Sequence, residues 1–129
     1  MSTYKILVVE DDPAYLDFVA LVISEAGYKV YKAHNGQEAF QIYEKRSEPI
    51  DLLFTDVVMP LMDGVTLSEK LLVITPNLKV IFTSGYSKES KFQSLQNEKI
   101  NFIEKPYEPK SLLKKIENVL SAVVVVTKA

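Results

Sequence analysis

Short apolar segments alternate with amphipathic ones along the whole chain, and this alternation restricts the fold more than any other feature. Continuous apolar segments lie at residues 6–9, 52–54, 80–82 and 102–103, and residues 29–33 form a further, partly alternating segment. Continuous apolar runs of this length are typical of strands in a parallel sheet covered on both faces. Five strand–helix units in succession therefore predict a doubly wound α/β fold with right-handed crossovers.

The segments between the strands carry helix signals. Asp12 followed by Pro13 favours a helix start, and Gly27 stands where a helix commonly ends. Asn35 with Glu38 is a capping pair for a second helix. Further helices are expected at residues 65–74, 88–97 and 112–120.

Length and charge exclude several classes of protein. The chain has 129 residues and a formal net charge of -2, which gives no general attraction to nucleic acid or anionic membrane. It has no cysteine, and it shows neither a signal peptide nor an apolar run of membrane-spanning length. We expect a cytoplasmic location and a single domain over residues 1–129. Its core would cover about 4–121, with a tail or truncated linker at 122–129.

Polar residues follow four of the predicted strands where each one ends: Glu10 and Asp11, Asp56, Thr83 and Ser84, and Lys105. In an open parallel sheet these ends line a crevice where ligands bind. Three carboxylates this close repel one another unless a divalent cation joins them, and Mg²⁺ prefers such oxygen ligands. A lysine adds a positive charge suited to phosphoryl oxygens. The set predicts phosphoryl transfer to an aspartate nucleophile beside Mg²⁺.

Four motifs, taken in order, resemble the response-regulator receiver domain of two-component signalling. They are Ile-Leu-Val-Val-Glu-Asp-Asp at 6–12, Asp-Val-Val-Met-Pro-Leu-Met-Asp-Gly at 56–64, Thr-Ser-Gly at 83–85 and Lys-Pro at 105–106. The resemblance covers roughly residues 4–121. It implies a flavodoxin-like five-stranded sheet of order 2-1-3-4-5. It also implies a signalling domain rather than an enzyme, although such a domain catalyses its own phosphorylation and dephosphorylation.

The resemblance assigns roles to single positions. Asp56 would be the phosphoacceptor for a phosphoryl group carried by a partner histidine kinase or histidine phosphotransfer protein. The implied Mg²⁺ ligands are Glu10, Asp11, Asp56 and the backbone carbonyl of Val58. The implied phosphoryl-binding residues are Thr83, Ser84 and Lys105. Thr83 and Phe102 would form the switch that changes a protein-interaction face.

The sequence departs from the family pattern at three places. Glu10 stands where aspartate is often found, and Phe102 replaces a tyrosine, so it brings no hydroxyl to the switch. Residues 97–100 replace a turn of small residues, which affects the fourth helix. We expect the partner surface, and a possible dimer, on the face of the fourth helix, fifth strand and fifth helix. Tyr86 and Tyr107 would flank the site there.

Several residues have simpler structural interpretations. Asp12 is predicted to be a helix cap, and Asp63 with Gly64 a turn and helix start. Phe102 fits the core as well as it fits a switch, because aromatic side chains mostly pack. His34, the only histidine, is expected at the surface.

Two other functions stay open. One is a receiver-like interaction module that is never phosphorylated. The other is an aspartyl-phosphate phosphatase of the haloacid-dehalogenase kind, which needs an aspartate where this chain has Val58. Since neither Val58 nor Gly85 can orient an attacking water, we expect a long-lived phosphoryl group. Residues 83–86 and 104–107 resemble receivers of hybrid sensor kinases, which favours a fragment over a free-standing relay protein.

Overall fold

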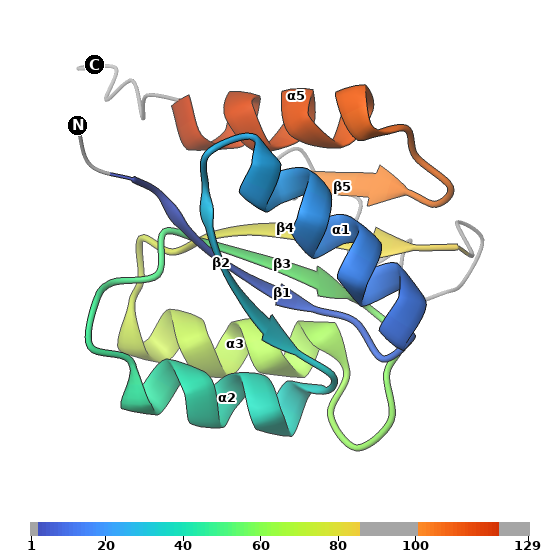
Figure 1. The fold of residues 1–129 in the computed structure, drawn as a ribbon. Helices are drawn as coiled ribbons and strands as arrows, with labels where there is room; N and C mark the ends of the chain where they lie inside the picture. The colour runs from blue at the N-terminus through green and yellow to red at the C-terminus, as the bar shows by residue number, and fades with distance from the viewer. Residues whose placement is uncertain (1–2, 86–100, 122–129) are drawn as a thin grey trace, which may run out of the picture.

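A computed structural model describes residues 3–85 and 101–121, and Figure 1 shows its ribbon. The strands are β1 (Lys5–Val9), β2 (Lys29–Ala33), β3 (Leu52–Asp56), β4 (Lys79–Ser84) and β5 (Asn101–Glu104). The helices are α1 (Pro13–Glu25), α2 (Gly36–Lys45), α3 (Gly64–Ile74) and α5 (Pro109–Ser121). All strand pairs are parallel and their order is β2-β1-β3-β4-β5. The predicted fold class and strand order are confirmed.

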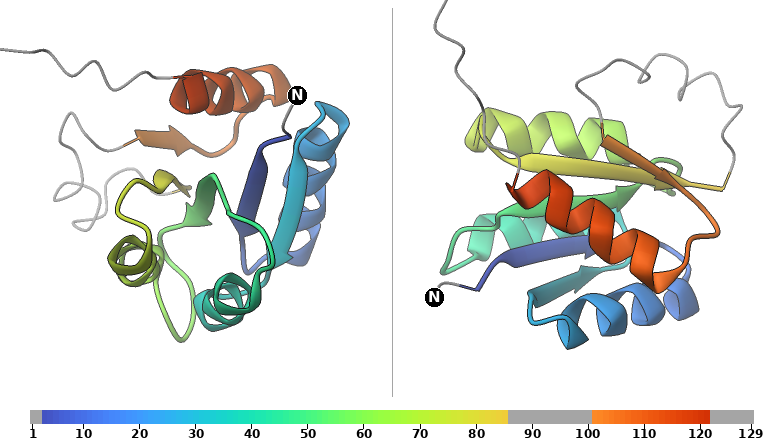
Figure 2. Two further views of the ribbon diagram at one scale, coloured as in Figure 1. Left: turned by 90° about the vertical axis from the view of Figure 1, so that its left-hand side faces the viewer. Right: turned by 90° about the horizontal axis from the view of Figure 1, so that it is seen from above.

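Helices cover both faces of the sheet. In Figures 1 and 2, α1 and α5 lie on one face and α2 and α3 on the other. Side chains of β1 alternate between the two layers: Ile6 and Val8 pack in the core under α1 and α5, whereas Leu7 and Val9 pack in the core over α2 and α3. The wholly apolar run in β1 exists because both of its faces are buried.

Polar caps set the helix starts. The carboxylate of Asp12 accepts a hydrogen bond from the backbone amide of Ala14 at 3.0 Å. Asn35 accepts one from the amide of Glu38 at 2.7 Å, and Asp63 accepts one from the amide of Thr66 at 2.8 Å. All three predicted helix starts are confirmed.

Some expectations fall on residues that the structure does not describe. The helix predicted at 88–97, the turn at 97–100, the tail at 122–129 and Tyr86 lie outside the described residues. Among the helices that are described, none combines the length and the apolar character that crossing a membrane requires.

Candidate functional site

The predicted site is a continuation of one face of the sheet. Residues two apart in a strand point to the same face. Four polar site residues each follow, at that spacing, a side chain that lies in or packs against the core under α1 and α5. The pairs are Val8 and Glu10, Phe54 and Asp56, Ile81 and Thr83, and Ile103 and Lys105. The core face therefore turns polar at the C-terminal edge of the sheet.

Backbone pairing extends this edge past the formal ends of two strands. The amide of Glu10 donates to the carbonyl of Ala33 at 3.1 Å, so the ladder between β1 and β2 continues for one more residue. The amide of Lys105 donates to the carbonyl of Ser84 at 2.9 Å. These bonds hold the two side chains in the alternating pattern of the sheet.

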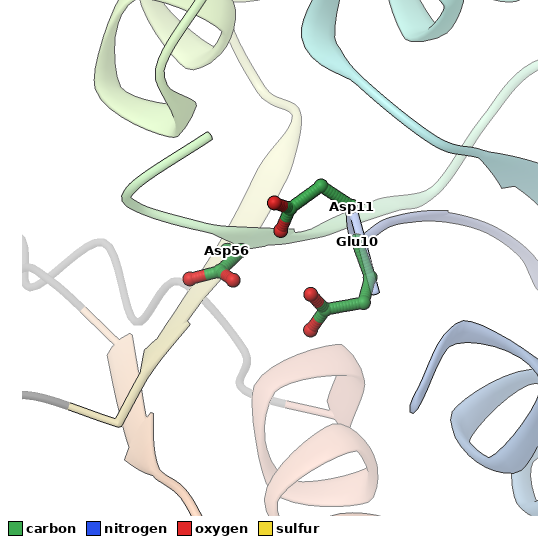
Figure 3. Close-up of side chains that lie close together, drawn as sticks. All are labelled: Glu10, Asp11 and Asp56. Atoms are coloured by element: carbon green, nitrogen blue, oxygen red, sulfur yellow. The ribbon is translucent and has the colours of Figure 1, made fainter. Parts of the chain in front are cut away.

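Three carboxylates meet at this edge. Glu10, Asp11 and Asp56 each offer an oxygen, and these oxygens lie within 4.8 Å of one another. Figure 3 shows the three side chains gathered around one place, with Glu10 and Asp11 coming from the end of β1 and Asp56 from the end of β3. Glu10 and Asp56 are buried, whereas Asp11 is exposed. The chemistry of this donor set, all hard oxygen, fits a divalent cation such as Mg²⁺.

Lys105 turns its side chain into the carboxylate cluster. Its Nζ donates to Oε1 of Glu10 at 2.6 Å and to Oδ2 of Asp56 at 3.2 Å. The Lys105–Pro106 peptide bond is cis. One cation thus bridges two buried carboxylates that come from different strands, and it partly balances their charge.

Burial dominates the electrostatics of the site. Desolvation raises the pKa of Glu10 to about 7, against the hydrogen bond from Lys105, and the nearby charge of Asp56 raises it further. Desolvation also raises the pKa of Asp56, although Lys105 opposes the shift. Burial acts to lower the pKa of Lys105, but its bonds to Glu10 and Asp56 outweigh burial and raise it. The carboxylates are therefore short of positive charge, which a bound cation would supply.

The first turn of α1 contributes a residue that the sequence did not indicate. The ring centroid of Tyr15 lies 4.5 Å from Nζ of Lys105, which is a cation–π contact. The amide of Asp12 donates to Oε2 of Glu10 at 3.2 Å. The predicted helix start at Asp12 could have pointed to Tyr15, because it fixes which residues of the first helical turn face the end of the sheet.

The loop after β3 is tied closely to the phosphoacceptor candidate. The amide of Val57 donates to the carbonyl of Thr83 at 3.0 Å, and the amide of Gly64 donates to the carbonyl of Val57 at 2.8 Å. A Cβ atom added at Gly64 would lie 2.1 Å from the carbonyl oxygen of Asp56. Only glycine fits this approach, so the Asp-Gly pair that begins α3 also sets the backbone at Asp56. The side chain of Val58 is exposed beside it.

The two predicted switch residues lie in different layers. Thr83 follows Ile81 on the face covered by α1 and α5, and it is 1% exposed. Phe102 is half-buried and packs with Phe82 and Val57, which form a separate cluster.

Ser84 is buried at the end of β4, and strand alternation turns it to the face opposite Thr83. The structure therefore places Thr83, but not Ser84, on the face that carries Glu10, Asp56 and Lys105. The roles of both residues stay predictions.

The expectation for Tyr107 is wrong. We predicted that this residue flanks the site as part of a partner surface, but it is 9% exposed and belongs to the core under α1 and α5. Its ring makes edge contacts with Tyr15 at 5.7 Å and Phe54 at 6.2 Å between centroids. The chain turns Tyr107 inward directly after the exposed Pro106, a path that strand periodicity does not predict.

Comparisons with known proteins identify relatives of this chain. The profile described as "Response regulator receiver domain" matches residues 6–117. The response regulator receiver protein CpdR of Brucella abortus (strain 2308) is 34% identical over 119 residues, which are 92% of this chain and 98% of CpdR. The sensor kinase CckA of the same organism is 35% identical over 116 residues, 89% of this chain but only 12% of that kinase.

Solved structures agree with the sequence matches. The crystal structure of the receiver domain from the hybrid histidine kinase CckA superposes with a TM-score of 0.77 at 34% identity. That match covers 90% of this chain and 98% of the other. Receiver domains are signalling domains, and here the family match, the sheet order and the carboxylate–lysine site coincide. The chain belongs to the response-regulator receiver domain family of two-component signalling.

Proposed function

We propose that this chain accepts a phosphoryl group from a partner histidine on Asp56 in a Mg²⁺-dependent reaction, and that the modification switches a protein-interaction face. The observation that carries the proposal is the position of Lys105, whose Nζ bridges Glu10 and Asp56 at 2.6 and 3.2 Å beside the Asp11 carboxylate. A receiver-like module that is never phosphorylated needs no such lysine turned into the site.

The chemical step needs little from the protein beyond placement and charge. A carboxylate oxygen of Asp56 attacks phosphorus, and an O–P bond forms as the N–P bond to the partner imidazole breaks. The imidazole nitrogen keeps the electron pair and takes up a proton from solvent. Lys105 would exchange one of its two present oxygen partners for an oxygen of the transferred group, where its charge offsets the added negative charge.

Glu10, Asp11 and Asp56 would hold the cation, together with the backbone carbonyl of Val58. The raised pKa of Glu10 and the raised pKa of Asp56 support this, because crowded carboxylates in a buried site bind cations as they lose protons. Mg²⁺, when bound, supplies charge neutralisation for the phosphoryl oxygens and fixes their orientation. Thr83 would complete the phosphoryl contacts at the end of β4, whereas the Ser84 hydroxyl, which strand alternation turns to the opposite face, would not contribute to them.

The proposed partners are a histidine kinase or a histidine phosphotransfer protein, and the proposed location is cytoplasmic. Relatives of both kinds of architecture match this chain, one a receiver of nearly the same length and one a long sensor kinase. We keep the face of β5, α5 and the helix predicted at 88–97 as the proposed output and dimer surface. Phe102 is half-buried on β5, so it is available there, whereas the buried Tyr107 is not.

Intact mass measurement tests the proposal. The protein is incubated with acetyl phosphate, with and without Mg²⁺, beside an Asp56→Asn control. We expect a gain of one phosphoryl group that needs both Mg²⁺ and Asp56. Absence of any gain in folded wild-type protein would refute phosphoacceptance and favour the unphosphorylated module. Steady release of phosphate from a small phosphomonoester would instead favour a phosphatase.

A further inference from the structure

Two hydroxyl groups are buried near the site with no partner. Among the described residues, Oγ1 of Thr83 and the hydroxyl oxygen of Tyr107 are the buried side-chain polar atoms that have no hydrogen bond. A buried hydroxyl that loses water without gaining a partner is unfavourable, and each such group needs an explanation. One of the two, Thr83, is paired with the phosphoacceptor candidate Asp56 in the sheet, and this is the starting point for the inference.

The two hydroxyls belong to one layer of the molecule. Tyr107 packs in the core under α1 and α5 that also contains Ile81, and Thr83 follows Ile81 on that same face. Burial raises the pKa of Tyr107, the neighbouring Tyr15 raises it further, and the neighbouring Thr83 opposes the rise. Their present geometry nevertheless falls short of a hydrogen bond. A change of the Thr83 rotamer is the movement that would form one.

The ring of Tyr107 is held in a fixed orientation. Tyr15 and Phe54 contact it edge-on at interplanar angles of 82° and 86°, so its hydroxyl has a fixed position in the core. Nζ of Lys105 also lies over the ring of Tyr15. Phe102, in contrast, lacks a hydroxyl and packs in the cluster of Val57 and Phe82. The tyrosine hydroxyl beside Thr83 therefore comes from position 107, not from position 102.

We infer that Tyr107 is a positioning residue for Thr83. In the protein without a phosphoryl group, a change of the Thr83 rotamer brings the Thr83 hydroxyl to the hydroxyl of Tyr107, and a phosphoryl oxygen on Asp56 competes for the same threonine. Thr83 is paired with Asp56 in the register of β3 and β4, so a rotamer change is enough to exchange one partner for the other. The competition with a phosphoryl oxygen rests on the proposed function. The pairing of the two hydroxyls is independent of that function.

A double-mutant cycle tests the competition. The dissociation constant of beryllium fluoride in Mg²⁺ is measured by calorimetry for wild type, Tyr107→Phe, Thr83→Val and the double variant. Loss of a resting hydrogen bond of ordinary strength should tighten binding by about two- to tenfold in Tyr107→Phe. The same change in the Thr83→Val background should have no effect. Tyr43→Phe is the matched control, because Tyr43 is a buried tyrosine whose hydroxyl bonds Thr75 at 2.5 Å in the other core layer.

Urea unfolding of the same four proteins, without Mg²⁺ or beryllium fluoride, tests the resting pair alone. We expect the effect of the double substitution on the unfolding constant to differ from the product of the two single effects by about two- to tenfold. Additive effects in unfolding, or an equal effect of Tyr107→Phe in both Thr83 backgrounds, would overturn the inference. If wild type neither binds beryllium fluoride nor gains a phosphoryl group, the proposed function fails, and the unfolding cycle alone decides whether the hydroxyls pair.

Discussion

Replacing Glu10 by glutamine should reduce the pH dependence of folding stability at neutral pH. Burial raises the pKa of Glu10 from 4.5 to about 7 in the folded protein. The folded state then binds this proton more tightly than the unfolded state does. Its stability contribution is complete below about pH 4.5 and is lost as the pH rises toward 7. Stability of the metal-free protein should therefore fall over this range.

The size of the effect follows from the shift. If Glu10 titrated alone, its pKa shift would change the free energy of unfolding by about 3 kcal/mol. Glu10 shares Lys105 with Asp56, whose pKa is also raised, so the two carboxylates titrate together and each carries part of the total. We expect wild type to lose about 1–2 kcal/mol between pH 5 and pH 8 through Glu10, and the Glu10→Gln variant to lose correspondingly less.

Urea unfolding followed by circular dichroism, at several pH values between 5 and 8 with a chelator present, measures this difference. Glu44→Gln, which removes an exposed carboxylate from α2, is the control for the change in net charge. A Glu10→Gln protein with the same pH slope as wild type would refute the reasoning. Adding Mg²⁺ should stabilise wild type more at pH 8 than at pH 5, because cation binding needs the ionised carboxylates.

Three further changes give separate tests. Gly64→Ala should destabilise the fold by about 3 kcal/mol in urea unfolding, because the new Cβ meets the carbonyl of Asp56. Gly85→Ala is the control: its Cβ enters open space, so the free energy of unfolding should change by no more than about 0.5 kcal/mol. Asp12→Ala should cost about 1 kcal/mol in the same assay through loss of the α1 cap; an unchanged midpoint would contradict that role. Val58→Asn should shorten the lifetime of the phosphoryl group about tenfold or more, read by mass, since an amide can orient an attacking water.

The sheet could be predicted from its continuous apolar runs, and the convergence of its polar ends from the parallel direction of the strands. Glu10 and Asp56 extend the alternation that buries Val8 and Phe54, so the same pattern that defines the core also defines the direction of the site carboxylates. Asp12 and Asp63 could be identified as caps, since an N-terminal carboxylate satisfies free amides whatever the tertiary context.

The aromatic contacts could not be predicted because they depend on a connecting segment in which apolar residues have no regular spacing. Tyr107 lies two residues before α5 begins at Pro109, in a connection whose path is set by packing alone. Its surroundings, Tyr15 and Phe54, come from a helix and a strand far apart in the sequence. Exposure was therefore misjudged for this tyrosine, although its neighbour Lys105 was placed correctly.

Glu10 and Asp56 keep Lys105 ionised, and the ring of Tyr15 helps to hold its side chain beside them. Burial alone acts to lower the pKa of Lys105, and a flexible side chain loses rotamer entropy when it is held in one position. The ring of Tyr15 offers its electron-rich face to Nζ, and Glu10 and Asp56 accept hydrogen bonds from the same atom, so the charge is balanced in the resting state. A phosphoryl group on Asp56 would add charge without moving the ring. Hence Lys105 can change its oxygen partner while its position is preserved, and Tyr15→Leu should impair this exchange more than Tyr15→Phe does.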